Sequence, residues 1–151
     1  MTKIFLDANV LIDIYDDARP YSQESGQLFT YLVQHRNHFM LFTSCDLMTT
    51  VYYLLRKQLD KKTVLEKLKI MNKIITIIDF TNEEIDEAIY LMEKNDNFSD
   101  LEDTIQLIMA KKVRCDYIVT NDKGFYSQDI PLLCSREALE VICSIPQERK
   151  I

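Results

Sequence analysis

The sequence predicts a single α/β domain with a central, mostly parallel sheet of about four to five strands and helices on both faces. Short apolar runs alternate along the chain with longer segments in which apolar residues recur at helical spacing. The first run, residues 4–6, contains no polar residue, which is typical of a parallel strand buried on both faces. With 151 residues, 47% of them hydrophobic, the chain is long enough to form one domain with its own core.

The first half of the chain contains three predicted strands, at residues 4–6, 39–43 and 74–80. Helices are expected over 10–15, 22–36 and 46–57, and over a further segment that starts at residue 60. Ser22 and Ser44 precede two of these helices and are the expected N-caps, because a serine hydroxyl can accept a bond from a free amide of the first turn.

The second half continues the alternation. Thr81 and Glu84 form a predicted capping box for a helix over 82–94. A polar turn leads to a helix over 100–112, which is followed by a strand over 115–120 and a short edge strand over 131–133. Ser135 is the expected cap of a last small helix. We assign residues 1–145 to the domain and residues 146–151 to a polar C-terminal tail.

Composition narrows the class of protein. No apolar run approaches the ~20 residues of a membrane span, and no signal peptide is visible, so we expect a cytoplasmic protein. The four cysteines contain no C-x-x-C pair and lie among apolar residues, which predicts reduced and mostly buried thiols. A zinc site is the weaker alternative, because the spacing does not match one.

Charge is distributed unevenly along the chain. The net charge of −6 argues against a broad electrostatic attraction to nucleic acid. Residues 56–73, however, contain seven basic and two acidic residues, whereas residues 79–103 contain ten acidic residues and one basic residue. This pattern fits two solvated helix faces of opposite sign, or a basic rim beside an acidic centre that binds a cation.

Several carboxylates are expected at the ends of predicted elements. Asp7 follows the first strand, Asp122 follows the fourth, and Asp100 and Asp103 share one face of a helical first turn. Each has an ordinary explanation as a cap or turn residue. If the first and fourth strands are neighbours, however, the acids converge, and converging carboxylates stay ionised only with a cation among them. Oxygen ligands suit Mg²⁺ or Mn²⁺, ions that assist phosphoester hydrolysis.

Four segments follow one another in a specific order: FLDANVL at 5–11, Ser44 with the helix TTVYYLLRK at 49–57, DLEDTIQ at 100–106 and DYIVTND at 116–122. In this order and spacing they resemble the PIN domain, the nuclease fold of VapC-like toxins, over about residues 3–139. The resemblance implies an endoribonuclease that depends on Mg²⁺ or Mn²⁺, acts on RNA and, if it is a toxin, is silenced by an antitoxin protein.

The resemblance also assigns roles to residues. The first, third and fourth acids of the family correspond to Asp7, Asp103 and Asp122, which are implied as catalytic metal ligands. Asp100 corresponds to an acid often found one turn before the third, and is implied to support catalysis. The supporting polar positions correspond to Asn9 and Thr120.

One position departs from the family pattern. The second acid, usually on the helix after the second strand, aligns with Thr50, which is a poor metal ligand. Asp46 lies one turn earlier and either supplies the missing carboxylate or caps the helix, and an acid in a first turn favours capping. Glu102 is expected to point away from the site, as a solvent or salt-bridge residue. The alternative function is a catalytically weak or inactive module with the same fold that binds RNA or protein.

Partner surfaces are expected around residues 46–73. The dense basic stretch predicts one flank of the RNA path, with Lys61, Lys62 and Lys67 as phosphate contacts. The resemblance also implies a homodimer, to which Tyr52, Tyr53 and Met71 would contribute; the alternative is that these residues all pack inward. A phosphotransfer receiver also places acids at strand ends, but Lys123 is too close to Asp122 for the lysine that such a domain needs.

Overall fold

The computed structural model describes residues 1–146, and these form one five-stranded sheet in which every pair of neighbours is parallel. The order across the sheet is β3-β2-β1-β4-β5. The strands are β1 (Thr2–Leu6), β2 (Phe39–Ser44), β3 (Ile75–Ile78), β4 (Tyr117–Val119) and β5 (Leu132–Leu133). Most of the predicted tail, residues 147–151, lies outside the described residues.

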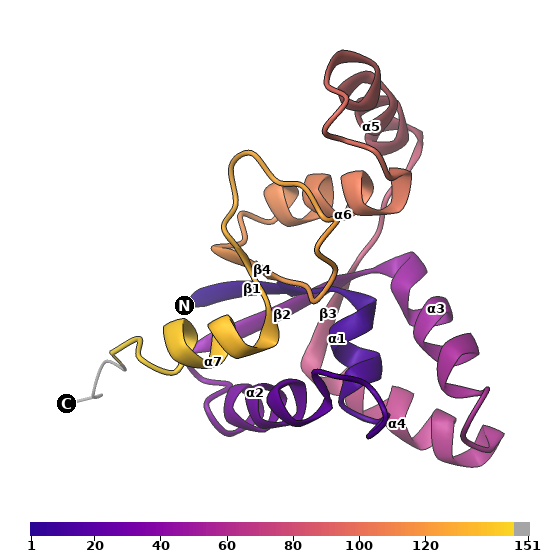
Figure 1. Ribbon diagram of the computed structural model, residues 1–151, viewed down its shortest axis with the longest axis vertical. Helices are drawn as coiled ribbons and strands as arrows, with labels where there is room; N and C mark the ends of the chain where they lie inside the picture. Colours follow the sequence, from indigo (N-terminus) through magenta and orange to yellow (C-terminus); the bar gives the residue numbers. More distant parts are fainter. Residues whose placement is uncertain (147–151) are drawn as a thin grey trace.

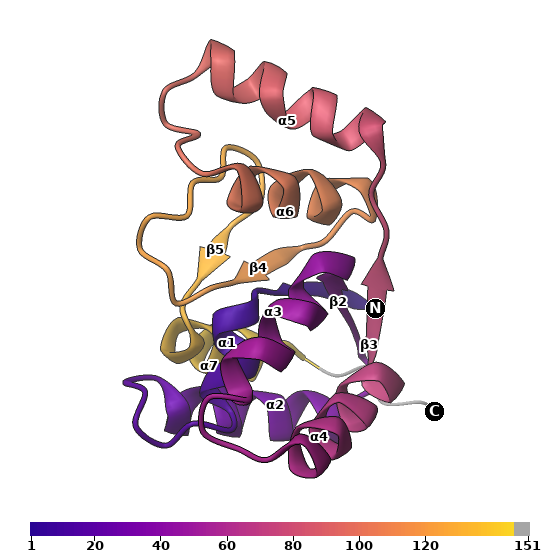
Figure 2. The same ribbon diagram turned by 90° about the vertical axis from the view of Figure 1, so that its right-hand side faces the viewer.

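Helices cover both faces of the sheet, as predicted. They are α1 (Ala8–Asp13), α2 (Ser22–Gln34), α3 (Cys45–Leu55), α4 (Lys61–Ile74), α5 (Asn82–Lys94), α6 (Leu101–Lys112) and α7 (Ser135–Ile142). Figure 1 shows α6 and α5 on one side of the sheet and α1, α2, α4 and α7 on the other. In the turned view of Figure 2, α6 lies between the sheet and α5. Within residues 1–146, no helix is long and apolar enough to cross a membrane.

The strand β1 is central because its apolar run can be buried on both faces. Ile4 and Phe5 are fully buried, as is Ile118 on the neighbouring strand β4. Leu6 pairs with Val119, and the Asp7 amide donates to the Val119 carbonyl at 3.0 Å. The predicted adjacency of the first and fourth strands is therefore confirmed, and it places the residues after both strands at one edge.

The capping box of α5 is confirmed. The Thr81 amide donates to Glu84 Oε2 at 2.9 Å, and the Thr81 side chain accepts from the first turn. Lys112 of α6 lies 2.9 Å from the same carboxylate and is the main reason that the pKa of Glu84 falls to about 2. The box thus also joins α5 to α6.

Two other predicted caps are wrong. Tyr21, without a side-chain bond, occupies the N-cap position of α2, and Ser22 is already helical. Cys134 caps α7, where it forms a capping box with Glu137. Ser135 is instead fully buried, and its hydroxyl lies 2.6 Å from that of Ser25. All four cysteines are free thiols, as predicted, but only one of them, Cys115, is buried.

Asn121, directly after β4, joins this edge of the sheet to the helices α1 and α7. Its side-chain amide donates to Asp13 Oδ2 of α1 at 2.6 Å and to Ser135 Oγ of α7 at 3.0 Å. Its carbonyl oxygen accepts from the Ser135 amide at 2.8 Å. Asp13 is buried and is also paired with Arg19. One amide side chain therefore satisfies buried groups on several elements and fixes the loop that carries Asp122.

Replacing this amide should destabilise the fold. Asn121→Ala leaves the Ser135 amide without its acceptor and Asp13 without one donor, and each such buried group costs about 1–3 kcal/mol, so we expect a loss of about 2–4 kcal/mol. Urea unfolding of Asn121→Ala measures it. Asn72→Ala, at an exposed position of α4, is the control and should change stability by about 0.5 kcal/mol or less. Equal unfolding midpoints for the two variants would contradict the role of Asn121.

Candidate active site

Asp7 follows β1 directly and is only 5% exposed. Three donors fix its carboxylate: the Ala8 amide at 2.7 Å, the Thr120 hydroxyl at 2.8 Å and the Asn9 side-chain amide at 2.9 Å. The bond from Ala8 makes Asp7 the N-cap of α1. Asp7 therefore fills both roles that the sequence left open, because it caps a helix and also stands at the carboxyl edge of the sheet.

Two polar side chains, Asn9 and Thr120, link this carboxylate to the loop after β4. Thr120 Oγ1 accepts from the Asp122 amide at 3.1 Å, and Asn9 Oδ1 accepts from the Asn121 amide at 3.0 Å. The Asp122 carboxylate accepts in turn from the Gly124 amide at 2.8 Å. The acids after β1 and β4 are thus held by one continuous set of hydrogen bonds.

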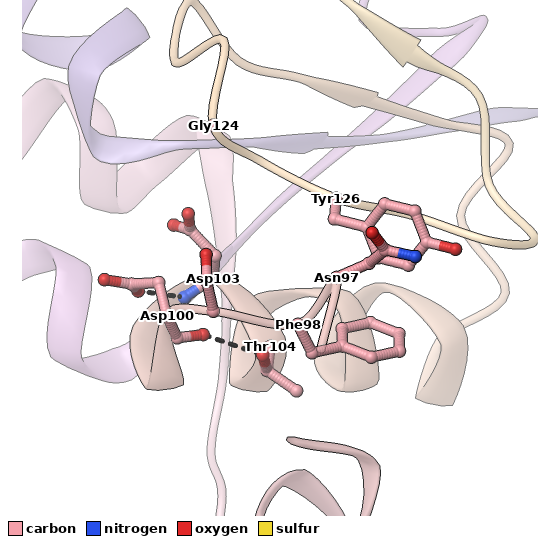
Figure 3. Close-up of a pocket in the computed structure, with 8 residues that line it drawn as sticks. Asn97, Phe98, Asp100, Asp103, Thr104, Gly124 and Tyr126 are labelled. Carbon is pink, nitrogen blue, oxygen red and sulfur yellow. Dashed lines mark hydrogen bonds between the residues drawn. The ribbon is translucent and has the colours of Figure 1, made fainter. Parts of the chain in front are cut away.

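The first turn of α6 brings further acids to this edge. Asp100 is the N-cap of α6, and its Oδ1 accepts from the Asp103 amide at 2.9 Å. The Thr104 hydroxyl donates to the Asp100 backbone carbonyl at 2.7 Å. Figure 3 shows the carboxylates of Asp100 and Asp103 next to each other at the start of the helix. The Asp100 carboxylate therefore caps the start of α6 by accepting from the backbone of Asp103.

All four predicted acids line one hollow of about 260 Å³. Thr50 and Leu54 of α3 and Arg19 also contribute to its wall. The acids that line it are Asp7, Asp100, Glu102, Asp103 and Asp122. The sheet topology and the α6 cap together thus gather five carboxylates from three parts of the chain.

Crowding of these carboxylates perturbs their ionisation. The pKa of Asp103 rises to about 7, first because of burial and then because of the charges of Asp7, Asp100, Asp122 and Glu102. Burial also raises the pKa of Asp7, and the hydrogen bonds that Asp7 accepts oppose this rise. The ionised forms are costly here, so the site is one in which a bound cation would be stabilised.

Glu102 is exposed to solvent, as expected, but the expectation that it points away from the site is wrong. Glu102 lines the hollow, and its charge acts on Asp103. The Cα–Cβ bonds of a helix tilt toward its N-terminus, so neighbouring residues of the first turn can all extend past the end of α6. In a helix interior, adjacent residues point in different directions. At the start of α6, however, the side chains of both Glu102 and Asp103 reach the hollow. The three acids of the segment DLED, at residues 100–103, were the sequence feature that could have placed Glu102 at the site.

Asp46 behaves as a first-turn residue of α3. Its carboxylate accepts from the hydroxyl of Ser44, the N-cap residue, and its backbone carbonyl accepts from the Thr50 hydroxyl at 3.4 Å. Thr50 lines the hollow, whereas Asp46 is absent from its wall. This arrangement agrees with a role for Asp46 at the helix start and leaves α3 without a carboxylate in the wall.

The predicted RNA contacts lie one helix away from the hollow. Lys61, Lys62 and Lys67 belong to α4, which packs on α3, and none of them is part of the wall as described. Lys67 Nζ lies 4.9 Å from the centre of the Tyr15 ring. These lysines therefore lie outside the hollow.

The residues predicted for a dimer surface differ in exposure. Tyr53 is 69% exposed and Tyr52 is half-buried. Met71 is fully buried, because it belongs to the apolar face of α4 that packs against the core, so its assignment to a surface is wrong.

Comparison with known proteins confirms the resemblance. A family model described as "PIN domain" matches residues 3–124. Ribonuclease VapC1 of Aquifex aeolicus is 47% identical over 138 residues, which cover 91% of this chain and 94% of the relative.

Two solved structures share the fold at lower identity. The toxin VapC20 of Mycobacterium tuberculosis, described as cleaving the sarcin-ricin loop, superimposes with a TM-score of 0.65 at 12% identity, over 81% of this chain and 92% of that one. The DNA-bound VapBC2 complex of Rickettsia felis gives a TM-score of 0.65 at 16% identity, over 88% of this chain and 98% of the other. The family match, the relative and the shared fold agree, and the chain belongs to the PIN domain family.

Proposed function

We propose that this protein is a metal-dependent endoribonuclease of the VapC type and the toxin of a toxin–antitoxin pair. The observation that carries the proposal is the convergence of Asp7, Asp103 and Asp122, with Asp100 beside them, on one hollow at the carboxyl edge of the sheet. The high identity to a relative named a ribonuclease, over nearly its whole length, supports the same activity here.

The donor chemistry fits Mg²⁺ or Mn²⁺. Each acid offers hard oxygen ligands. Burial and then the neighbouring carboxylates raise the pKa of Asp103, and a cation among these groups would favour their ionised forms. No three Asp, Glu, His or Cys side chains within residues 1–146 already form a metal cage. Mg²⁺ is often held by one or two carboxylates while it keeps several waters, so a complete cage is not required. Asp7, Asp103 and Asp122 would hold the ion, and Asp100 would support Asp103.

Hydrolysis adds one water across a phosphodiester: its oxygen bonds to phosphorus, one P–O ester bond breaks and the leaving oxygen gains a proton. A bound divalent ion would lower the pKa of a water molecule and stabilise negative charge on the phosphate. The chain itself supplies positioning. Thr120 and Asn9 prevent Asp7 from rotating, and the Gly124 amide holds Asp122, so the carboxylates need little rearrangement before reaction.

The second candidate is a module with the same fold that binds RNA or protein without cleaving. Thr50 in the wall of the hollow favours it, because the side chain adds no charge at that point. The two candidates differ in one observable, which is metal-dependent cleavage of RNA.

We further propose an antitoxin protein as a partner, and a homodimer. The solved structures that share the fold include a toxin–antitoxin complex from Klebsiella pneumoniae and FitAB bound to a DNA fragment. The exposed Tyr53 on α3 remains available for such contacts.

Removing a proposed ligand should abolish cleavage. Asp103→Asn and Asp122→Asn each keep the side-chain shape but remove a charge, and we expect single-stranded RNA cleavage to fall roughly 100-fold or more. EDTA should stop the wild-type reaction, and added Mn²⁺ should restore it. Asp86→Asn, at an exposed position of α5, is the control. Cleavage that resists EDTA, or that is equal in Asp103→Asn and Asp86→Asn, would disprove the nuclease mechanism.

The basic segment should affect RNA binding more than chemistry. We expect the Lys61→Ala/Lys62→Ala/Lys67→Ala variant to bind single-stranded RNA more weakly, with a salt-dependence slope that is smaller by about 2 because three phosphate contacts are lost. Fluorescence anisotropy at several salt concentrations measures the slope.

The control removes positive charge from the opposite layer with Lys94→Ala/Lys111→Ala. That variant should keep the wild-type slope. An unchanged slope in the α4 variant would remove α4 from the RNA path.

A further inference from the structure

We infer that Glu102 provides, from α6, the carboxylate that α3 lacks at position 50, and so completes the acid set of the metal site. The inference rests on the proposed ribonuclease function and adds a residue to its site. It makes Glu102 and Asp103, which are adjacent in sequence, partners in holding one ion.

The walls of the hollow show where charge is present and where it is missing. The first turn of α6 contributes Asp100, Glu102 and Asp103 to the wall, whereas α3 contributes Thr50 and Leu54. The Thr50 hydroxyl is already directed at the Asp46 carbonyl within its own helix, at 3.4 Å. The residues that α3 contributes to the wall are therefore uncharged, whereas Glu102 is one of three acids that α6 contributes.

The surroundings of Glu102 are acidic. Glu102 lines the hollow together with the carboxylates of Asp7, Asp100, Asp103 and Asp122. Among the residues that the structure describes, Glu102 forms no ion pair, and Arg19, the cation in the wall, pairs with Asp13. A carboxylate that is crowded by other carboxylates is stabilised when a cation binds among them.

Gln106 supplies an independent sign that a ligand belongs at this place. It lies one turn after Glu102 on α6 and is 1% exposed, yet neither its Oε1 nor its Nε2 has a hydrogen-bond partner within residues 1–146. Its amide is close enough to Asp7 to lower the pKa of that carboxyl, although the geometry falls short of a full hydrogen bond. Buried amides rarely lack a hydrogen-bond partner. The Gln106 amide is therefore available to form a hydrogen bond with a water molecule that coordinates an ion at Asp7.

The test is a double-mutant cycle on Mn²⁺ affinity, measured by isothermal titration calorimetry without RNA. Glu102→Gln keeps the shape of the side chain and should weaken Mn²⁺ binding roughly tenfold or more. Thr50→Glu places a carboxylate on α3, and in the Glu102→Gln background it should return the affinity to near the wild-type value. Single-stranded RNA cleavage should follow the same order across the four proteins.

Glu83→Gln is the matched control, because Glu83 occupies the same second position of its helix in α5 and lies away from the hollow. It should leave Mn²⁺ affinity unchanged, which separates metal binding from a general effect of charge at a helix start. Asp103→Asn is the reference for the loss of a ligand.

Three results would count against the inference. If Glu102→Gln binds Mn²⁺ as the wild type does, Glu102 is not part of the site. If Glu102→Gln is weakened but Thr50→Glu does not restore it, Glu102 does not replace the α3 carboxylate. If the wild type itself binds no Mn²⁺, the proposed function fails and the inference fails with it, so the two failures are distinguishable.

Discussion

The site depends on the hydrogen bond that the Thr120 hydroxyl donates to Asp7 at 2.8 Å. It joins the ends of β1 and β4, which are neighbours only because the apolar residues 4–6 bury a central strand on both faces. Asp7 is nearly removed from water, and its burial would favour the neutral acid. Donors from Thr120, Asn9 and the Ala8 amide keep the carboxylate available as an acceptor in one orientation.

Hydrogen bonds also hold two further acids at this edge. The Asp122 carboxylate accepts from the Gly124 amide, and the Asp100 carboxylate accepts from the Asp103 amide. Burial first, and then the charges of the neighbouring acids, raise the pKa of Asp103. The hydrogen bonds of the Asn121 side chain hold the loop that carries Asp122 against α1 and α7. Gathering like charges in this hollow therefore costs folding free energy, as is typical of functional sites.

Local pattern was sufficient to predict the α/β alternation and the α5 capping box, because strand burial and helical spacing are short-range signals. The convergence of the four acids followed only on the condition that the first and fourth strands are neighbours, which the sheet order supplies. Local pattern failed where a side chain's role depends on distant partners. Ser135 could not be distinguished from a cap without knowing that Asn121 and Ser25 contact it. Met71 fitted a surface face until α4 was seen to pack against the core. Glu102 was misplaced because helical spacing does not apply to the open end of a helix.

The central claim is that these carboxylates share a divalent ion. A crystal structure of the protein soaked with Mn²⁺, with the ion located by anomalous scattering, tests it most directly. We expect the ion in the hollow, ~2.0–2.3 Å from oxygens of Asp7, Asp103 or Asp122, with water in its remaining positions. An ion bound elsewhere, or carboxylates that lie more than ~10 Å apart in the experimental structure, would contradict a shared metal site.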